Sequence, residues 1–175
     1  TMRGYRKRPG TQGFSVPLVG ASLFFIISLF LFASYKNSAY QQAKKEIYSL
    51  YTANRAFDLD EVYQDGLTAI YAKEYGKTAT EAGCEALEQT GLPYVLLLSQ
   101  FSAPVERVYV TNCQLSETGR EKKARTYDYT VSVRFCLEKG DEVLAPEKTM
   151  DFHGTVVMKK KGWFRWLLDG VTLGE

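Results

Sequence analysis

The sequence is poor in the side chains that most often build metal and catalytic centres. It contains a single histidine, His153, so one chain cannot assemble a cluster of imidazole ligands. Its three cysteines, Cys84, Cys113 and Cys136, are odd in number and have no C-x-x-C spacing, which argues against a disulfide framework and a zinc site. We therefore expect a protein that is not an enzyme, with no catalytic residues, no cofactor and no metal site.

The chain also lacks a strong excess of either charge. Twenty-two Lys and Arg residues face 20 Asp and Glu residues, a formal net charge of +2. Four of the basic residues lie in the first 13 positions, where there is no acid, so the remainder sums to −2 (18 basic against 20 acidic). Since the basic character belongs to a short leader, nucleic acid is not expected as a partner.

Charge is absent altogether from Phe14 to Tyr35. A helix of these 22 residues, at about 1.5 Å per residue, is long enough to cross a hydrocarbon core of roughly 30 Å. The segment also lacks the polar stripe of a helix that packs on a protein core. The pattern predicts a basic cytoplasmic leader over residues 1–13, a transmembrane helix over 14–35 and an extracytoplasmic domain over 36–175.

A cleaved signal peptide has a similar basic start and apolar centre, but the end of this segment does not fit one. Signal cleavage needs small residues one and three positions before the cut. A cut after Ala33 puts Leu31 at the outer position, and a cut after Ser34 puts Phe32 there. We therefore expect the segment to stay in the membrane.

Basic residues on both sides of the segment set its expected orientation. Four precede it, and Lys36, Lys44 and Lys45 follow it closely. The excess on the N-terminal side favours an N-terminus in the cytoplasm. We expect a single-pass protein of the cell membrane whose domain lies outside the cytoplasm, with a cytoplasmic domain as the alternative.

Three helices are expected before the sheet. Apolar side chains at three- and four-residue steps from Tyr40 to Asn54 predict an amphipathic helix, and the absence of Pro and Gly predicts that the membrane helix continues into it. Asp58 to Glu61 resembles a capping pair for a second helix, and Thr78 to Glu81 one for a third, which ends at Gly91. Cation binding by the acids of the first pair is less well supported, because they lack calcium-loop spacing.

Beyond Pro104 the apolar period changes to two. Alternation is clearest from Thr126 to Leu137, and further strands are expected at Glu106–Leu115, Met150–Lys159 and Trp163–Leu173. The sequence thus predicts an α+β fold, with helices packed on one face of a four-stranded antiparallel meander sheet.

A tight turn between the first two strands should fix the register of the cysteines. If the turn lies near Gly119, Cys113 falls opposite Tyr127. A disulfide between Cys113 and Cys136 is therefore not expected.

Two short motifs invite a catalytic interpretation. Gly76-Lys77-Thr78 looks like the end of a phosphate-binding loop, but Tyr71 replaces the first glycine of that loop and a helix precedes it. His153 should lie on the wet face of its strand, flanked by Asp151 and Thr155. We interpret the first motif as a helix end followed by a cap, and the histidine as a surface residue.

The segment KKKGWFRW, from Lys159 to Trp166, mixes cations with aromatic rings. Such a patch is able to contact lipid headgroups, an anionic wall polymer or a nucleic acid. It also fits a hairpin tip in which the lysines are solvated and Trp163 and Trp166 pack on the sheet. We favour the hairpin tip, because strand alternation by itself buries one face of such a segment.

The start of the chain resembles a known family. A short basic leader ends in Gly13, Phe14 follows, and the apolar segment begins at once. Prepilins begin in this way, and a peptidase cuts them between such a glycine and the next residue. With its long helix and antiparallel sheet, the chain is similar to the small single-pass pseudopilin-like proteins of tight-adherence pilus systems. The resemblance implies cleavage between Gly13 and Phe14 and a role in pilus assembly, with the lipid bilayer and other membrane subunits as partners.

The same elements also resemble the nuclear-transport-factor-like domain, which combines three helices with a curved four-stranded sheet. Bitopic scaffold subunits of conjugation and type IV secretion machines carry that domain outside the membrane. This second resemblance implies an uncleaved membrane segment and a domain that forms a homo-oligomer or binds neighbouring subunits.

Overall fold

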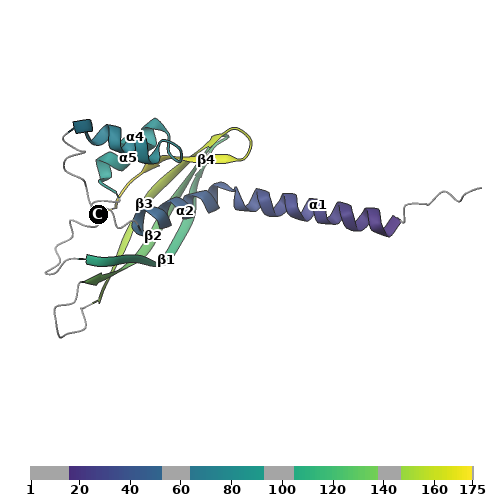
Figure 1. The fold of residues 1–175 in the computed structure, drawn as a ribbon, viewed down its shortest axis with the longest axis horizontal. Coiled ribbons are helices and arrows are strands. Elements are labelled where there is room, and N and C mark those ends of the chain that lie inside the picture. Colours follow the sequence, from purple (N-terminus) through teal and green to yellow (C-terminus); the bar gives the residue numbers. More distant parts are fainter. Residues whose placement is uncertain (1–15, 53–63, 93–104, 138–146, 175) are drawn as a thin grey trace, which may run out of the picture. The chain divides into compact units, whose positions relative to one another are not determined.

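The structure, a computed structural model, describes residues 16–52, 64–92, 105–137 and 147–174 (Figure 1). The chain divides into two compact units, Thr1–Tyr35 and Lys36–Glu175, and each is described by itself. The described elements are α1 (Val16–Lys36), α2 (Ala39–Thr52), α4 (Leu67–Tyr75), α5 (Glu81–Thr90), β1 (Val105–Arg120), β2 (Ala124–Leu137), β3 (Glu147–Lys161) and β4 (Arg165–Val171). The predicted α+β class is confirmed.

Helix α1 presents large apolar side chains that are exposed. Nine of them, 49–74 % exposed, are Leu23, Phe24, Phe25, Ile26, Ile27, Leu29, Phe30, Leu31 and Phe32. Among the described helices, none by itself is long and apolar enough to cross a membrane, whereas the interrupted pair Gly20–Lys36 and Ala39–Thr52 qualifies by length and composition. The helical part of the prediction is confirmed, and its membrane location stays a prediction.

The expected continuation of the first helix into the second is wrong, because the helix is interrupted at Asn37 and Ser38. Ser38 caps α2: its hydroxyl oxygen accepts a hydrogen bond from the backbone N–H of Gln41 at 3.3 Å. Serine followed three residues later by glutamine is a capping-box sequence. The lack of Pro and Gly permits a continuous helix, but this cap starts a new one.

The four strands form one antiparallel sheet in the order β1-β2-β3-β4, so the predicted meander is confirmed. Strand β2 lies between β1 and β3 and shows the predicted alternation. Its buried side chains are Tyr127, Tyr129, Val131, Val133 and Phe135.

The register of the first hairpin differs from the expectation. Strand β1 extends to Arg120, which pairs with Arg125, so the turn lies beyond Gly119. Cys113 is therefore opposite Val131 rather than Tyr127, and Cys136 is opposite Arg107. None of the three cysteines forms a disulfide.

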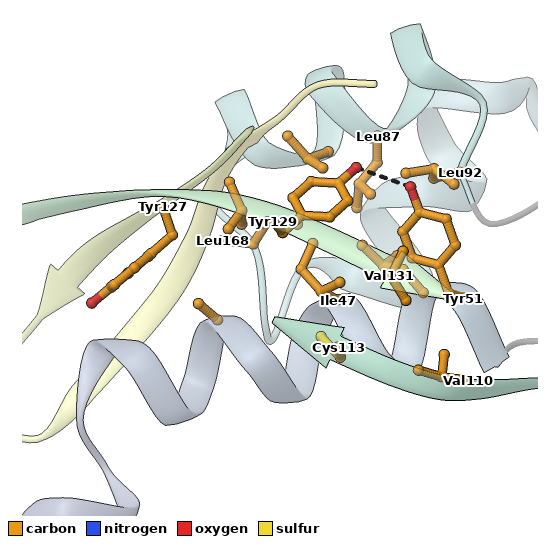
Figure 2. Close-up of a cluster of buried hydrophobic side chains, with 14 of the residues drawn as sticks. Ile47, Tyr51, Leu87, Leu92, Val110, Cys113, Tyr127, Tyr129, Val131 and Leu168 are labelled. Carbon is orange, nitrogen blue, oxygen red and sulfur yellow. Dashed lines mark hydrogen bonds between the residues drawn. The ribbon is translucent and has the colours of Figure 1, made fainter. Parts of the chain in front are cut away.

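Two helices cover the buried side of the sheet. Helix α2 packs on β1 and also contacts the other three strands, while α5 packs on β4. Figure 2 shows side chains from α2 (Ile47), α5 (Leu87) and β2 (Val131) in the same hydrophobic cluster. The approach of α5 to β4 requires a glycine, because a Cβ on Gly83 would lie 2.1 Å from the carbonyl oxygen of Leu168.

The start of α5 corrects a second expectation. Its cap is Thr80, not Thr78: the Thr80 hydroxyl accepts from the N–H of Gly83 at 3.1 Å and donates to Asp169 at 2.6 Å. The carbonyl of Thr78 instead accepts from the N–H of Leu168 at 2.9 Å, which attaches this segment to β4. Because Thr78 pairs with β4, helix α5 begins two residues later than predicted.

Two other helix boundaries lie at glycines. The predicted end of α5 at Gly91 is confirmed, with the glycine in the left-handed region at φ 73°. Gly66, at φ 78°, directly precedes α4. The proposed capping pair at Asp58 to Glu61 lies outside the described residues.

Two tyrosines place hydroxyl groups inside the core. Tyr51 of α2 and Tyr129 of β2 are 0 % and 2 % exposed, and their oxygens lie 2.9 Å apart (Figure 2). Tyr129 donates to the carbonyl of Thr172 at 2.9 Å, so Tyr51 is the donor within the pair. Burial, reinforced by Tyr129, raises the pKa of Tyr51, which keeps its proton in place. This hydrogen-bond chain ties α2 through β2 to the segment that follows β4.

Removal of the Tyr129 hydroxyl should destabilise the protein more than removal of the Tyr51 hydroxyl. Tyr129→Phe leaves the buried Tyr51 hydroxyl without its acceptor and Thr172 without its donor, so we expect a loss of about 2 kcal/mol in the free energy of unfolding. Tyr51→Phe removes one donor only, and about 1 kcal/mol is expected. Urea unfolding of the detergent-solubilised chain, followed by near-ultraviolet circular dichroism, measures both. Equal losses would contradict the assigned direction.

Candidate functional site

Among the sequence motifs with possible chemistry, the structure brings Lys77 and Thr78 beside residues 164–166 of the segment KKKGWFRW. Gly13 and Phe14, the candidate cleavage residues, lie outside the described residues. His153 is exposed on the outer face of β3 beside Asp151 and Thr155, as predicted. The Thr155 hydroxyl donates to Asp128 across the strands at 3.1 Å. That the chain is not an enzyme stays a prediction.

Gly76-Lys77-Thr78 is a helix end, as expected. Gly76 has right-handed helical backbone angles and its N–H donates to the carbonyl of Ala72 at 2.9 Å. The backbone N–H groups of Thr78 and Ala79 both donate to the carbonyl of Tyr75, at 2.9 and 2.7 Å. A phosphate-binding loop directs such groups at its ligand, so this segment does not have that geometry.

The cysteines are placed as structural residues. Burial raises the pKa of the Cys84 and Cys113 thiols, and Lys44 opposes this at Cys113. A nucleophilic thiol needs the opposite shift. Within the ranges that the structure describes, no three His, Cys, Asp or Glu side chains form a group able to hold a metal ion.

The feature that stands out is the hairpin between β3 and β4. We call residues 159–166 (KKKGWFRW) the basic-aromatic tip. Lys161 pairs with Arg165, and the turn begins at Gly162 with φ 72°. Trp163 is 86 % exposed and Phe164 is 53 % exposed, while Lys159, Lys160, Lys161 and Arg165 are also exposed. The predicted hairpin with solvated lysines is therefore confirmed.

The prediction that both tryptophans pack on the sheet is right for Trp166 and wrong for Trp163. Trp166 lies on β4, is half-buried and packs against the hydrophobic core. Trp163 occupies the turn, where the alternation of strand faces no longer applies. The aromatic ring at the tip is thus presented to the surroundings.

Two cations contact the ring of Trp166, which lies next to the turn of the tip. The Arg125 guanidinium lies 5.4 Å from its ring centroid, and the Lys160 ammonium lies 6.0 Å from it. Lys160 faces Trp166 across the two strands, and its N–H donates to the carbonyl of Lys123 at 2.7 Å. Cation–π contacts and strand pairing therefore fix the strand ends next to the turn of the tip.

The neighbouring turn adds further cations. Strand pairing sets Ala124 opposite Lys159, so the turn between β1 and β2 lies beside the tip. Lys122 and Lys123 in that turn are exposed. The two turns together form a continuous basic end of the sheet.

A small cleft of about 130 Å³ lies next to the tip. Its walls come from the start of α2, the segment between α4 and α5, and the tip. The lining residues are Asn37, Gln42, Lys45, Glu46, Lys77, Thr78, Phe164, Arg165, Trp166 and Leu167. Arg165 donates to the carbonyl of Lys77 and so links two of these walls.

The cleft has a mostly positive lining and one carboxylate. Lys45, Lys77 and Arg165 carry the positive charge, and Glu46 carries the negative charge. Burial raises the pKa of the Glu46 carboxyl, an effect that Lys45 opposes. The cleft also joins the tip to Asn37, the first residue after α1.

Sequence patterns identified the residues of the tip but not the cations that the fold brings beside it. Lys45, Lys77 and Lys122 are far from the tip in the chain, and no motif links them to it. The pairing of the two turns is a consequence of the meander, in which alternate turns share one end of the sheet.

No protein-family model, no curated protein and no solved structure matches this chain. Its function is therefore inferred from its own residues.

The two tryptophans should differ sharply in their effect on stability. Trp166→Ala removes a half-buried ring with its cation contacts, and we expect a loss of about 1–3 kcal/mol in the free energy of unfolding. Trp163→Ala removes an exposed ring and should change it by less than about 0.5 kcal/mol. Urea unfolding followed by far-ultraviolet circular dichroism compares them. A large loss for Trp163→Ala would mean that its ring packs on the domain.

Proposed function

We propose that this protein is a membrane-anchored, non-enzymatic component of the bacterial envelope, a minor pilin-like subunit that acts in pilus assembly. The observation that carries the proposal is helix α1, whose apolar side chains are exposed and which is joined directly to a small α+β domain. A helix with this composition is stable with its side chains in lipid rather than in water.

The surface of α1 supports association with other membrane helices. Gly20, Ala21 and Ser22 are consecutive small residues, and an added Cβ on Gly20 would meet nothing within 4 Å. Small residues let helix backbones approach closely in a bilayer. We propose that this part of α1 packs beside the membrane helices of partner subunits.

The domain supports the pilin-like part of the proposal. An apolar N-terminal helix followed by an amphipathic helix that lies on an antiparallel meander is the arrangement expected of the pseudopilin-like proteins. Pilins carry a glutamate five residues into the mature chain, and Leu18 stands at that position here. Because that carboxylate helps to register neighbouring pilin subunits, we propose a minor assembly role rather than that of the main filament subunit.

A second candidate is a bitopic scaffold subunit of a conjugation or type IV secretion machine. It is favoured by α5, which packs on β4 while α2 packs on β1, so that more than one helix covers the sheet as in the nuclear-transport-factor-like domain. The two candidates differ in the fate of the N-terminus, since only the pilin-like one is processed.

A charge near the middle of α1 should impair membrane association. We expect the full chain to stay in the membrane pellet after carbonate extraction, and Ile26→Lys to move part of it to the supernatant, since a central lysine costs about 2.5–3.5 kcal/mol. Tyr35→Lys is the matched control, because a lysine at the helix end reaches the interface. Unmodified protein in the supernatant would exclude both candidate functions.

Processing should shorten the chain at its N-terminus. The pilin-like function predicts a mature protein that begins at Phe14, and Gly13→Leu should leave the leader attached. Intact-mass spectrometry of protein extracted from membranes of the native host measures this directly. A wild-type chain that keeps its leader would count against the pilin-like role and favour the secretion scaffold.

A further inference from the structure

We propose that the basic-aromatic tip docks on the headgroup layer of an anionic lipid bilayer, where Trp163 and Phe164 insert between lipids and the surrounding cations bind lipid phosphates. This inference rests on the proposed function, because the bilayer concerned is the one that α1 is proposed to enter. It assigns a second membrane contact to the domain, at a site far from α1 in the sequence.

The aromatic residues of the tip are the first support. Trp163 is 86 % exposed, and Phe164 beside it is more than half exposed. Within the described part of residues 36–175, these two rings form the apolar end of a hairpin rather than an isolated surface side chain. Tryptophan in particular favours the boundary between lipid and water, where its ring is buried and its N–H meets polar groups.

Charge complementarity identifies the partner. Exposed cations surround the two rings on both turns: Lys122, Lys123, Lys159, Lys160, Lys161 and Arg165. Two carboxylates reduce this positive charge. One is that of Asp169, whose Oδ1 lies 3.7 Å from the Lys159 Nζ, and the other is that of Glu121 in the turn between β1 and β2. A positive surface with protruding aromatic rings matches an anionic bilayer, which attracts basic residues and accommodates the rings.

The covalent chain links α1 to the part of the domain that lies beside the tip. Asn37 lines the cleft beside the tip and directly follows Lys36, the last residue of α1. Consecutive Cα atoms are about 3.8 Å apart, so Asn37 stays near the point where the apolar helix ends. If α1 enters a bilayer, its covalent link keeps the start of α2 near the interface, and the tip lies beside that start within the domain.

The tip is also ordered before it binds. Two cations, Arg125 and Lys160, contact the ring of Trp166, and Arg165 is hydrogen-bonded to the carbonyl of Lys77. A hairpin that is already fixed loses little conformational freedom on docking. Nucleic acid is the less suitable partner, because the tip is a protruding point and not a groove that follows a strand.

Tryptophan fluorescence provides the test, because the chain contains two tryptophans. The full-length Trp166→Phe variant reports on Trp163 alone, and the Trp163→Phe variant serves as its matched control. Each is reconstituted into vesicles of phosphatidylcholine and phosphatidylglycerol that carry bromine high on their acyl chains. We expect a greater fractional loss of emission for Trp163 than for Trp166.

A charge reversal tests the electrostatic part. Lys161→Glu, made in the Trp166→Phe background, should reduce the quenching of Trp163 in anionic vesicles. Lys148→Glu, near the other end of β3, should leave the quenching unchanged. Raised salt should act like Lys161→Glu, since exposed charges are screened.

The outcomes separate this inference from the proposed function. Protein that fails to co-float with the vesicles would reject the membrane anchor itself. Protein that floats but shows equal quenching of Trp163 and Trp166 would reject the docking of the tip and leave the anchor in place. A blue shift of Trp163 emission on addition of a single-stranded oligonucleotide, without quenching by brominated lipid, would overturn the assignment in favour of nucleic acid.

Discussion

The packing of α2 on the sheet is the constraint on which the rest of this structure depends. Its buried face consists of Ala39, Ala43, Ile47, Leu50 and Tyr51. The small residues come first along the helix, so that its start lies close to the strands, and the large ones fill the core further on. The other strands then pair beside β1 and β2 in the order of the meander, so the position of α2 sets the layer in which the core forms.

The core is specified by polar contacts as well as by apolar burial. A buried hydroxyl without a partner is costly, so the Tyr51–Tyr129 pair fixes one rotation of α2 over β2. The contact from Tyr129 to Thr172 extends the constraint to the end of the chain. The C-terminal segment is thereby part of the fold. Its backbone N–H groups at Thr172 and Gly174 also donate to carbonyls of β3.

Among the described residues of the domain, exposed cations and aromatic rings gather on the two neighbouring turns at one end of the sheet. Burial raises the pKa values of the Cys84 and Cys113 thiols, and the backbone N–H groups of Thr78 and Ala79 donate to the carbonyl of Tyr75. The two turns that carry Lys122 and Trp163 instead present charge and aromatic rings outwards. An anchoring or assembly protein needs such surfaces for partners and lipid, which agrees with the function proposed.

The sequence by itself determined the elements whose cause is local. Periodicity gave the four strands and their order, the run without charge gave the first helix, and Gly91 marked the end of α5, because backbone geometry and side-chain alternation act over a few residues. The break at Ser38 also has a local cause, the capping box from Ser38 to Gln41. The prediction of a continuous helix relied instead on the absence of Pro and Gly. Only the tertiary structure decided the start of α5 at Thr80, the exposure of Trp163 and the meeting of Lys45 with the tip. These depend on contacts between residues far apart in the chain, whose distances are set by the packing of α2 and α5 on the sheet.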